Sequence, residues 1–258
     1  MSKIFQTGAL LAALVANVAG HTCVEKFEAG GQTYEGYYQG SKISSLTSML
    51  PLPYTAPAPA GSKVTFHWHH DGSCGGDENG WDCSHHGWTA TYLAPCNGDC
   101  AKVDKTELEF FKIHQSALID YRSGRYSEGS KQEQPGYWGT DAIFYDNNNA
   151  QSVEIPSDIP SGNYVLRTEV MSIHNNGAVA NRQFWPQAFN IKVTGGDDSA
   201  SVPSGKKGTE LYSASDALLE WDLYWHTAGE TIPDVPGIQL ASVASASKTR
   251  RHARDFSS

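Results

Sequence analysis

The feature that most constrains the fold is a series of short strand-like segments that are separated by turn residues and show no helical period. Residues 63–69 alternate, with Phe66 and Trp68 on one face and His67 and His69 on the other, which predicts a half-buried strand. Further strand-like runs lie at residues 89–94, 108–113, 152–155, 162–171 and 187–194. Many short strands with turn signals between them predict an all-β fold, an antiparallel β-sandwich.

The segments around these runs complete one domain. Residues 21–40 predict two strands joined by a turn at Gly30-Gly31, and the proline-rich residues 41–61 predict an irregular loop. Residues 197–240 predict a long segment that wraps against the sandwich through Leu211, Leu218, Leu219, Trp221 and Trp225. Residues 241–258 are rich in Ala and Ser and then basic, so we expect a disordered tail.

The first 20 residues have the composition of a secretory signal peptide. Lys3 gives a basic start, residues 8–16 are apolar, and Val18 and Gly20 are the small residues expected before a cleavage site. The apolar run is too short for a membrane span. Cleavage after Gly20 would leave 238 of the 258 residues, and we expect this mature protein, residues 21–240 plus the tail, to be secreted and extracellular, not bound to a membrane, and monomeric.

The charge of the chain narrows the class of partner. Asp and Glu number 28 against 19 Lys and Arg, for a formal net charge of −9, and no basic stripe interleaved with aromatic residues is visible. Nucleic acid is therefore not an expected partner. An acidic secreted protein suits an uncharged or insoluble substrate better than a polyanion.

Five cysteines lie beyond the cleavage site, and in a secreted chain they indicate disulfides. Cys96 and Cys100 are placed to close a tight loop. Cys74 can pair with Cys83, which would leave Cys23 over, or Cys23 can pair with Cys83. The spacing does not choose between these two connectivities.

Cleavage after Gly20 would make His21 the first residue, and an N-terminal histidine is a metal chelate. Its α-amine loses a proton at about pH 7.7–8.0 and binds together with the imidazole. One more imidazole would complete a three-nitrogen site, which suits copper.

The second imidazole has several candidates. His85 and His86 are adjacent, and neighbouring side chains diverge in an extended chain, so one of them would face a given site. His67, His69 and His70 fit a solvated strand face better than a second metal site. His174 follows a strand that is expected to be buried, and is either an ordinary loop histidine or a donor beside a metal.

Several stretches together resemble a known family. They are the predicted cleavage before His21, then residues 84–87 (Ser-His-His-Gly), 92–100 (Tyr-Leu-Ala-Pro-Cys-Asn-Gly-Asp-Cys), 103–113, 163–167 and 187–195. Over roughly residues 21–240 the chain resembles fungal lytic polysaccharide monooxygenases of auxiliary activity family nine, formerly glycoside hydrolase family sixty-one.

The resemblance implies an immunoglobulin- or fibronectin III-like sandwich that holds one copper ion, Cu(II) or Cu(I). His21 would supply its amine and a ring nitrogen, and His85 the third nitrogen. His174 and Gln183 match the residues that hydrogen-bond the oxygen co-substrate, and Trp185 stands at the axial copper position. The implied reaction is oxidative cleavage of β-1,4-linked glycans, of the cellulose or hemicellulose class, with an external electron donor and O₂ or H₂O₂.

The chain also departs from the family pattern. Trp185 replaces the usual axial tyrosine, Ala188 the usual cysteine, and residues 232–238 lack a tyrosine that helps to form a flat glycan-binding platform. These departures favour an alternative, a copper-binding secreted protein with little or no glycan cleavage. A glycoside hydrolase would need a carboxylate pair at suitable spacing, and none accompanies the predicted copper ligands.

Overall fold

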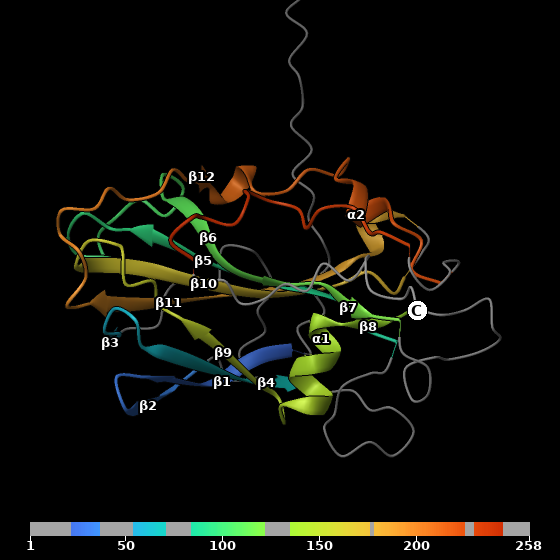
Figure 1. Cartoon of the computed structure of the whole chain (residues 1–258), viewed down its shortest axis with the longest axis horizontal. Coiled ribbons are helices and arrows are strands. Elements are labelled where there is room, and N and C mark those ends of the chain that lie inside the picture. The colour runs from blue at the N-terminus through green and yellow to red at the C-terminus, as the bar shows by residue number, and fades with distance from the viewer. Residues whose placement is uncertain are drawn as a thin grey trace, which may run out of the picture.

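The computed structural model describes residues 22–36, 54–70, 84–121, 135–175, 178–224 and 230–244, which form two packed β-sheets (Figure 1). The smaller sheet has the strand order β2-β1-β4-β9 within these ranges. Its strands are β1 (Thr22–Ala29), β2 (Gln32–Glu35), β4 (Lys63–His70) and β9 (Ala150–Glu154). The turn at Gly30-Gly31 joins β1 to β2, as the sequence predicts.

The larger sheet has the order β12-β6-β5-β10-β11-β3 in the described part of the chain. Its strands are β3 (Thr55–Pro57), β5 (Gly87–Pro95), β6 (Glu109–Ser116), β10 (Gly162–Ser172), β11 (Gln183–Val193) and β12 (Lys206–Lys207). Neighbouring strands are antiparallel, with the exception of the edge strand β3, which pairs parallel to β11. The predicted β-sandwich is therefore confirmed, with one parallel edge. The edge strand β3 lies within residues 41–61, for which the sequence predicted an irregular loop, so that prediction is wrong for Thr55–Pro57.

Short elements fill the connections. β7 (Leu118–Asp120) and β8 (Tyr137–Trp138) form a small hairpin, which leads into the helical turns α1 (Gly139–Asp141) and η2 (Ala142–Asp146). The remaining turns are η3 (Val179–Asn181), η4 (Gly208–Glu210) and α2 (Ala217–Glu220). None of the helices in the described ranges has the length and apolarity needed to cross a bilayer.

The main core lies between the two sheets. Phe27 of β1 stacks on Phe66 of β4 with ring centroids 5.3 Å apart, and on Phe189 of β11 at 4.5 Å. Val24, Trp68, Leu166 and other apolar side chains fill the same layer. The alternation of β4 explains the arrangement, because Phe66 and Trp68 are buried while His67 and His69 lie at the outer surface.

A second apolar layer covers the outer face of the larger sheet. Residues 205–224 and 230–240 pass over this face (Figure 1), and Leu211, Leu218 and Leu219 are buried against it. The prediction that this segment wraps the sandwich is thus confirmed, although Trp225 lies outside the described residues. Because β5 and β10 are covered on both faces, nearly all of their residues are buried.

A charged network is buried within this second layer. Glu169 of β10 is fully buried and accepts a hydrogen bond from Arg167 Nε at 3.0 Å. Lys112 of β6 donates to the carbonyl of Pro236 at 2.8 Å, which ties the wrapping segment to the sheet. Burial lowers the pKa of Lys112 to about 8 and raises the pKa of Glu169, because each loses hydration that its charged form needs.

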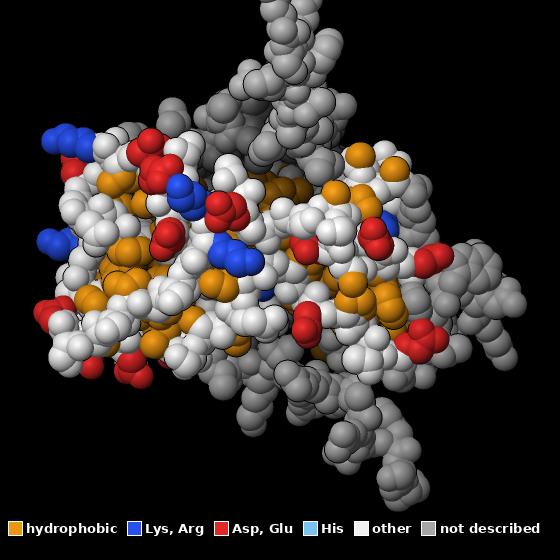
Figure 2. Space-filling view, turned by 90° about the horizontal axis from the view of Figure 1, so that it is seen from above, with side chains coloured by type: hydrophobic (Ala, Val, Ile, Leu, Met, Phe, Trp, Pro, Cys, Tyr) orange, Lys and Arg blue, Asp and Glu red, His pale blue; other side chains and the backbone are white. Residues whose placement is uncertain are grey.

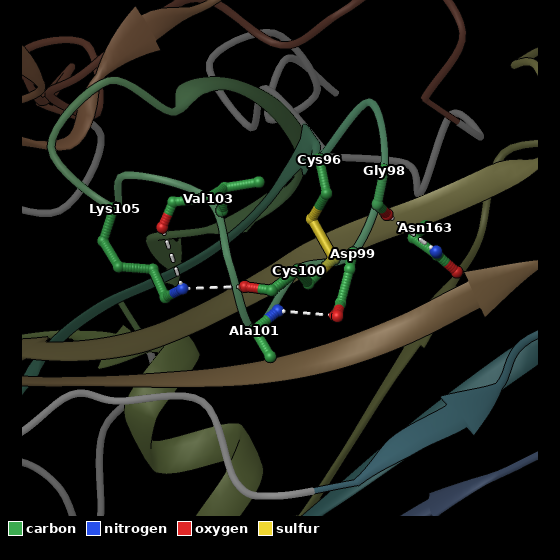
Figure 3. The surroundings of a disulfide bond; sticks show 8 residues. All are labelled: Cys96, Gly98, Asp99, Cys100, Ala101, Val103, Lys105 and Asn163. Atoms are coloured by element: carbon green, nitrogen blue, oxygen red, sulfur yellow. Dashed lines mark hydrogen bonds between the residues drawn. A yellow bond between two sulfur atoms is a disulfide. The ribbon is translucent and has the colours of Figure 1, made fainter.

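The predicted Cys96–Cys100 disulfide closes the loop after β5 (Figure 3). Lys105 Nζ donates to the carbonyl of Cys100 at 2.7 Å, and Asn163 Nδ2 donates to the carbonyl of Gly98 at 2.8 Å. Cys23 is buried in β1, whereas Cys74 and Cys83 lie outside the described residues, so the two predicted connectivities stay open.

The covered face carries charges of both signs. Figure 2 shows acidic and basic side chains interspersed there with apolar ones, with no large field of one sign.

Candidate functional site

Several strand ends meet at one end of the sandwich. In the smaller sheet, Thr22 at the start of β1 pairs with His70 at the end of β4. In the larger sheet, Ser172 at the end of β10 pairs with Gly87 at the start of β5 and with Gln183 at the start of β11. Antiparallel pairing thus brings residues that are far apart in the sequence together at one end of the sandwich.

His85 lies among these strand ends and is 6% exposed. Its ring stacks on that of His174, with centroids 3.9 Å apart and an interplanar angle of 21°. Trp185 lies beside these two rings, with its ring centroid 6.0 Å from that of His85 and an interplanar angle of 29°. Three of the residues predicted for the site therefore form one aromatic cluster.

Hydrogen bonds from Thr140 hold the turn that carries His85. Thr140 Oγ1 donates to the carbonyl of His85 at 3.2 Å and accepts from the amide of Gly87 at 3.0 Å. A Cβ at Gly87 would lie 1.9 Å from the carbonyl oxygen of Met171, so only glycine allows β5 to approach β10 here.

His86 points away from this cluster, as the sequence predicts for one of two adjacent histidines. It is fully buried, and its Nδ1–H donates to both carboxylate oxygens of Asp141, at 2.9 and 3.0 Å. Asp141 also accepts a hydrogen bond from the amide of Trp138 at 2.7 Å. The pair anchors the His85 turn to α1, because each of the two buried side chains supplies the hydrogen-bond partner that the other needs.

His174 is held by its own strand. Its Nδ1 hydrogen-bonds Ser172 Oγ at 2.7 Å, and the carbonyl of His86 accepts from Ser172 Oγ at 3.3 Å and from the amide of Ile173 at 2.9 Å. The side chain of His174 is half-buried. The structure places His174 against His85, and the choice between an ordinary loop histidine and a donor beside a metal stays a prediction.

Gln183 and Trp185 both come from the start of β11. Trp185 is 2% exposed and belongs to the main core. Gln183 is half-buried, and its Oε1 is buried without a hydrogen-bond partner among the described residues. A buried amide oxygen of this kind indicates a partner that is not part of the described chain, because such groups are normally paired.

One prediction from the sequence is wrong. We expected His70 on a solvated strand face with His67 and His69, but it is 4% exposed and joins the cluster. Its ring lies 5.4 Å from that of His85, edge-on, and its Nδ1 hydrogen-bonds Thr22 Oγ1. The alternation of β4 contains the reason, since His70 has the same parity as the inward-facing Trp68.

His21 lies outside the described residues, so its predicted place as a ligand is not tested. Within the described ranges, no three side chains of His, Cys, Asp or Glu are arranged to hold a metal ion. Thr22, the residue next to His21, lies directly against His70.

Known proteins share this sequence and architecture. A sequence model of Auxiliary Activity family 9, formerly GH61, matches residues 31–231. The AA9 family lytic polysaccharide monooxygenase AA17 of Aspergillus oryzae is 36% identical over 273 aligned residues, which cover 94% of this chain and 99% of that protein. The AA9 family lytic polysaccharide monooxygenase B of Aspergillus fumigatus is 36% identical, with 89% and 94% covered.

Solved structures agree with these relatives. The extended catalytic domain of H. jecorina LPMO9A is 36% identical over 74% of this chain and 71% of that chain, with a TM-score of 0.52. The crystal structure of HiLPMO9B has a TM-score of 0.63 at 26% identity and covers 86% of this chain and 99% of its own. The match extends over the sandwich and the strand ends that carry the histidine cluster, and the chain therefore belongs to auxiliary activity family 9, the copper-dependent lytic polysaccharide monooxygenases.

Proposed function

We propose that this chain is a secreted enzyme that cleaves β-1,4-linked glycans oxidatively, using one copper ion held by His21 and His85. The observation that carries the proposal is the stacking of His85 on His174 beside Trp185, next to the strand that begins at Thr22. Family membership supplies the reaction class. Removal of residues 1–20 during export would create the required N-terminus, and we expect the mature protein to act as a monomer.

The residues present suit copper. His21 offers an amine and an imidazole, and His85 a second imidazole, and three nitrogen donors of this kind favour copper among the divalent metals. The Thr22–His70 hydrogen bond supports the assignment, because it brings the start of the mature chain beside the ring that packs on His85. Bound copper would supply one-electron redox chemistry toward O₂ or H₂O₂, with electrons from an external reductant.

The polar side chains beside His85 would orient the oxygen co-substrate. Ser172 fixes the orientation of the His174 ring through Nδ1, and the ring would act on the co-substrate from that position. The Gln183 amide is placed by the same strand pair, Ser172 with Gln183, and its buried Oε1 is a suitable hydrogen-bond acceptor there. Both groups would orient a small polar molecule and hold its protons without coordinating the metal.

A second function is favoured by one observation. Trp185 fills the position where the family pattern has tyrosine, and its indole is buried against His85 and contributes no phenolic oxygen. A copper-binding protein with little turnover would tolerate this change. The two proposals differ in whether the copper-loaded protein releases oxidised sugars.

We further propose a soluble or amorphous β-glucan, a hemicellulose or a cell-wall glycan as substrate in preference to crystalline cellulose. A flat crystal face needs aromatic rings in one plane, and residues 232–238 contain no tyrosine. Residues 71–82 contain Asp71, Asp77, Glu78 and Asp82, and this composition predicts an acidic insert beside His85 that would hinder docking on a flat surface; the insert lies outside the described residues. A pull-down on microcrystalline cellulose tests the preference, and strong binding with abundant oxidised cello-oligosaccharides would contradict it.

The decisive experiment compares three copper-loaded proteins: the mature chain that starts at His21, the same chain with one extra N-terminal alanine, and His85→Ala. Copper affinity is measured by calorimetry, and products of an ascorbate-driven reaction on a glycan panel by mass spectrometry. We expect tight binding and oxidised products for the first protein alone. Equal copper affinity in all three would rule out His21 and His85 as ligands. Tight binding without products would favour the copper-binding alternative.

A further inference from the structure

A buried arginine fixes the backbone around His174. Arg182 lies between η3 and β11 and is 8% exposed. Its Nη1 donates hydrogen bonds to the carbonyls of Ile173 and Asn175, the second at 2.7 Å. The Ile173 carbonyl belongs to the peptide unit that precedes His174, and the Asn175 carbonyl lies one residue beyond it, so one guanidinium nitrogen binds the backbone on both sides of His174.

The same guanidinium also binds the wrapping segment. Nε donates to the carbonyl of Leu219 at 2.9 Å, and Nη2 donates to the carbonyl of Trp221 at 3.0 Å. Leu219 belongs to α2, and the last carbonyls of a helix have no partners within the helix. Arg182 satisfies these carbonyls and thereby joins α2 to the His174 loop.

Three independent contacts therefore determine where the His174 ring lies. Arg182 holds the backbone, Ser172 holds Nδ1 at 2.7 Å, and the ring of His85 covers one face at a centroid distance of 3.9 Å. Without the Arg182 contacts, the hydrogen bond from the Ile173 amide to the carbonyl of His86 would still hold the backbone before His174, but the backbone from His174 onward would be less restrained and freer to shift. A stacked pair is sensitive to such a shift because its geometry is specific.

The chemistry of the contact requires an arginine. Four carbonyls in two segments are reached by a planar fork of fixed geometry, which the single ammonium of lysine does not reproduce. Burial lowers the pKa of Arg182 from its ordinary value, and the nearby carboxylate of Asp222 acts in the opposite direction. A guanidinium stays protonated in such a setting, so the contact persists across the working pH range.

We propose that Arg182 is a positioning residue for His174, which couples the α2 segment to the orientation of the ring over His85. Its effect on turnover rests on the proposed function, whereas its effect on the backbone does not. The geometry predicts that Arg182→Lys disturbs the loop at residues 173–175 and the segment at residues 219–221 together.

The test uses the full mature protein and the variants Arg182→Lys, His174→Ala and the double variant. Arg167→Lys is the matched control, because Arg167 is 7% exposed and lies in the separate Glu169 pair. Amide hydrogen exchange is measured on the metal-free proteins. Consumption of hydrogen peroxide with ascorbate is measured on the copper-loaded proteins, together with copper affinity and thermal stability.

We expect Arg182→Lys to accelerate exchange at both segments and to lower kcat by about tenfold, while copper affinity changes much less. In the His174→Ala background it should lower kcat no further, since it acts through that ring. Arg167→Lys should lower stability without lowering kcat. Unchanged exchange at residues 173–175, or an equal loss of kcat with and without His174, would overturn the proposal. If the wild type consumes no peroxide, the proposed function fails, and the exchange data alone decide on Arg182.

Discussion

Replacing Trp185 by tyrosine restores the family's usual residue at a position where the consequence can be calculated. Trp185 is 2% exposed, with its ring 6.0 Å from His85 and 6.2 Å from His70. Tyrosine is smaller by on the order of 30 Å³, and at about 24 cal/mol per Å³ of cavity the loss of packing costs roughly 1 kcal/mol. For a chain of this size that corresponds to a fall in Tm of about 2–4 °C.

The functional effect should exceed this small structural one. A phenolic oxygen would stand beside His85 where the indole offers only an apolar surface, and the environment around a metal tunes its electronic properties. We therefore expect the electron paramagnetic resonance spectrum of Cu(II)-loaded Trp185→Tyr to differ from that of the wild type. The rate of reoxidation by hydrogen peroxide should change as well.

Trp68→Tyr is the matched control. Trp68 is 1% exposed and lies in the same core between the sheets, so the same substitution should lower Tm without changing the copper spectrum. An identical spectrum in Trp185→Tyr, with the expected fall in Tm, would show that the side chain at position 185 packs in the core but does not face the metal. An unchanged Tm would refute the packing calculation itself.

Three further predictions concern stability. Burial lowers the pKa of His114 to about 4 from 6.5, so the unfolded chain binds a proton between these values that the folded chain does not. Stability is therefore highest above pH 6.5 and falls as the pH drops toward 4. His114→Gln should flatten this slope in urea titrations from pH 7 to 4, and an unaltered slope would contradict the assignment. His86→Ala leaves the buried Asp141 carboxylate without its partner and should cost about 3–5 kcal/mol in urea unfolding, with a loss below about 1 kcal/mol counting against the buried pair. Replacing Cys96 and Cys100 by serine opens a five-residue loop and should lower the free energy of unfolding by about 2 kcal/mol. Because β5 separates this loop from His85, the copper spectrum should stay unchanged.

The strands could be predicted from the sequence because side-chain alternation reports directly on burial. Residues 63–69 were assigned from period two, and β4 occupies Lys63–His70 with the expected faces. The same rule, extended by one residue, places His70 inside, so the information needed for that position was in the sequence. The helical turns at residues 139–146 gave no such signal, because they are too short to show a period.

The cluster itself could be predicted in part. His85 and His174 were candidates from their residue type, the resemblance selected them together with Trp185, and the structure brings the three rings together. The groups that hold them could not be identified in this way. Ser172, Thr140 and Arg182 act through contacts that only the folded chain creates, and a serine, a threonine or an arginine at an arbitrary position carries no recognisable pattern.

Substitutions at the candidate donors and at the residues that support them should have different effects on the site. The candidate donors are few and are fixed by chemistry, whereas their supports come from elements far apart in the chain: Thr140 from α1 under the His85 turn, and Arg182 from the start of β11 around His174. A substitution at a support alters the distance between rings without removing a donor. It should therefore affect turnover more than metal affinity, the reverse of what is expected at His85. A variant that lowers kcat but leaves copper affinity unchanged therefore marks a residue that positions the side chains around the metal, and a variant that lowers copper affinity marks a ligand.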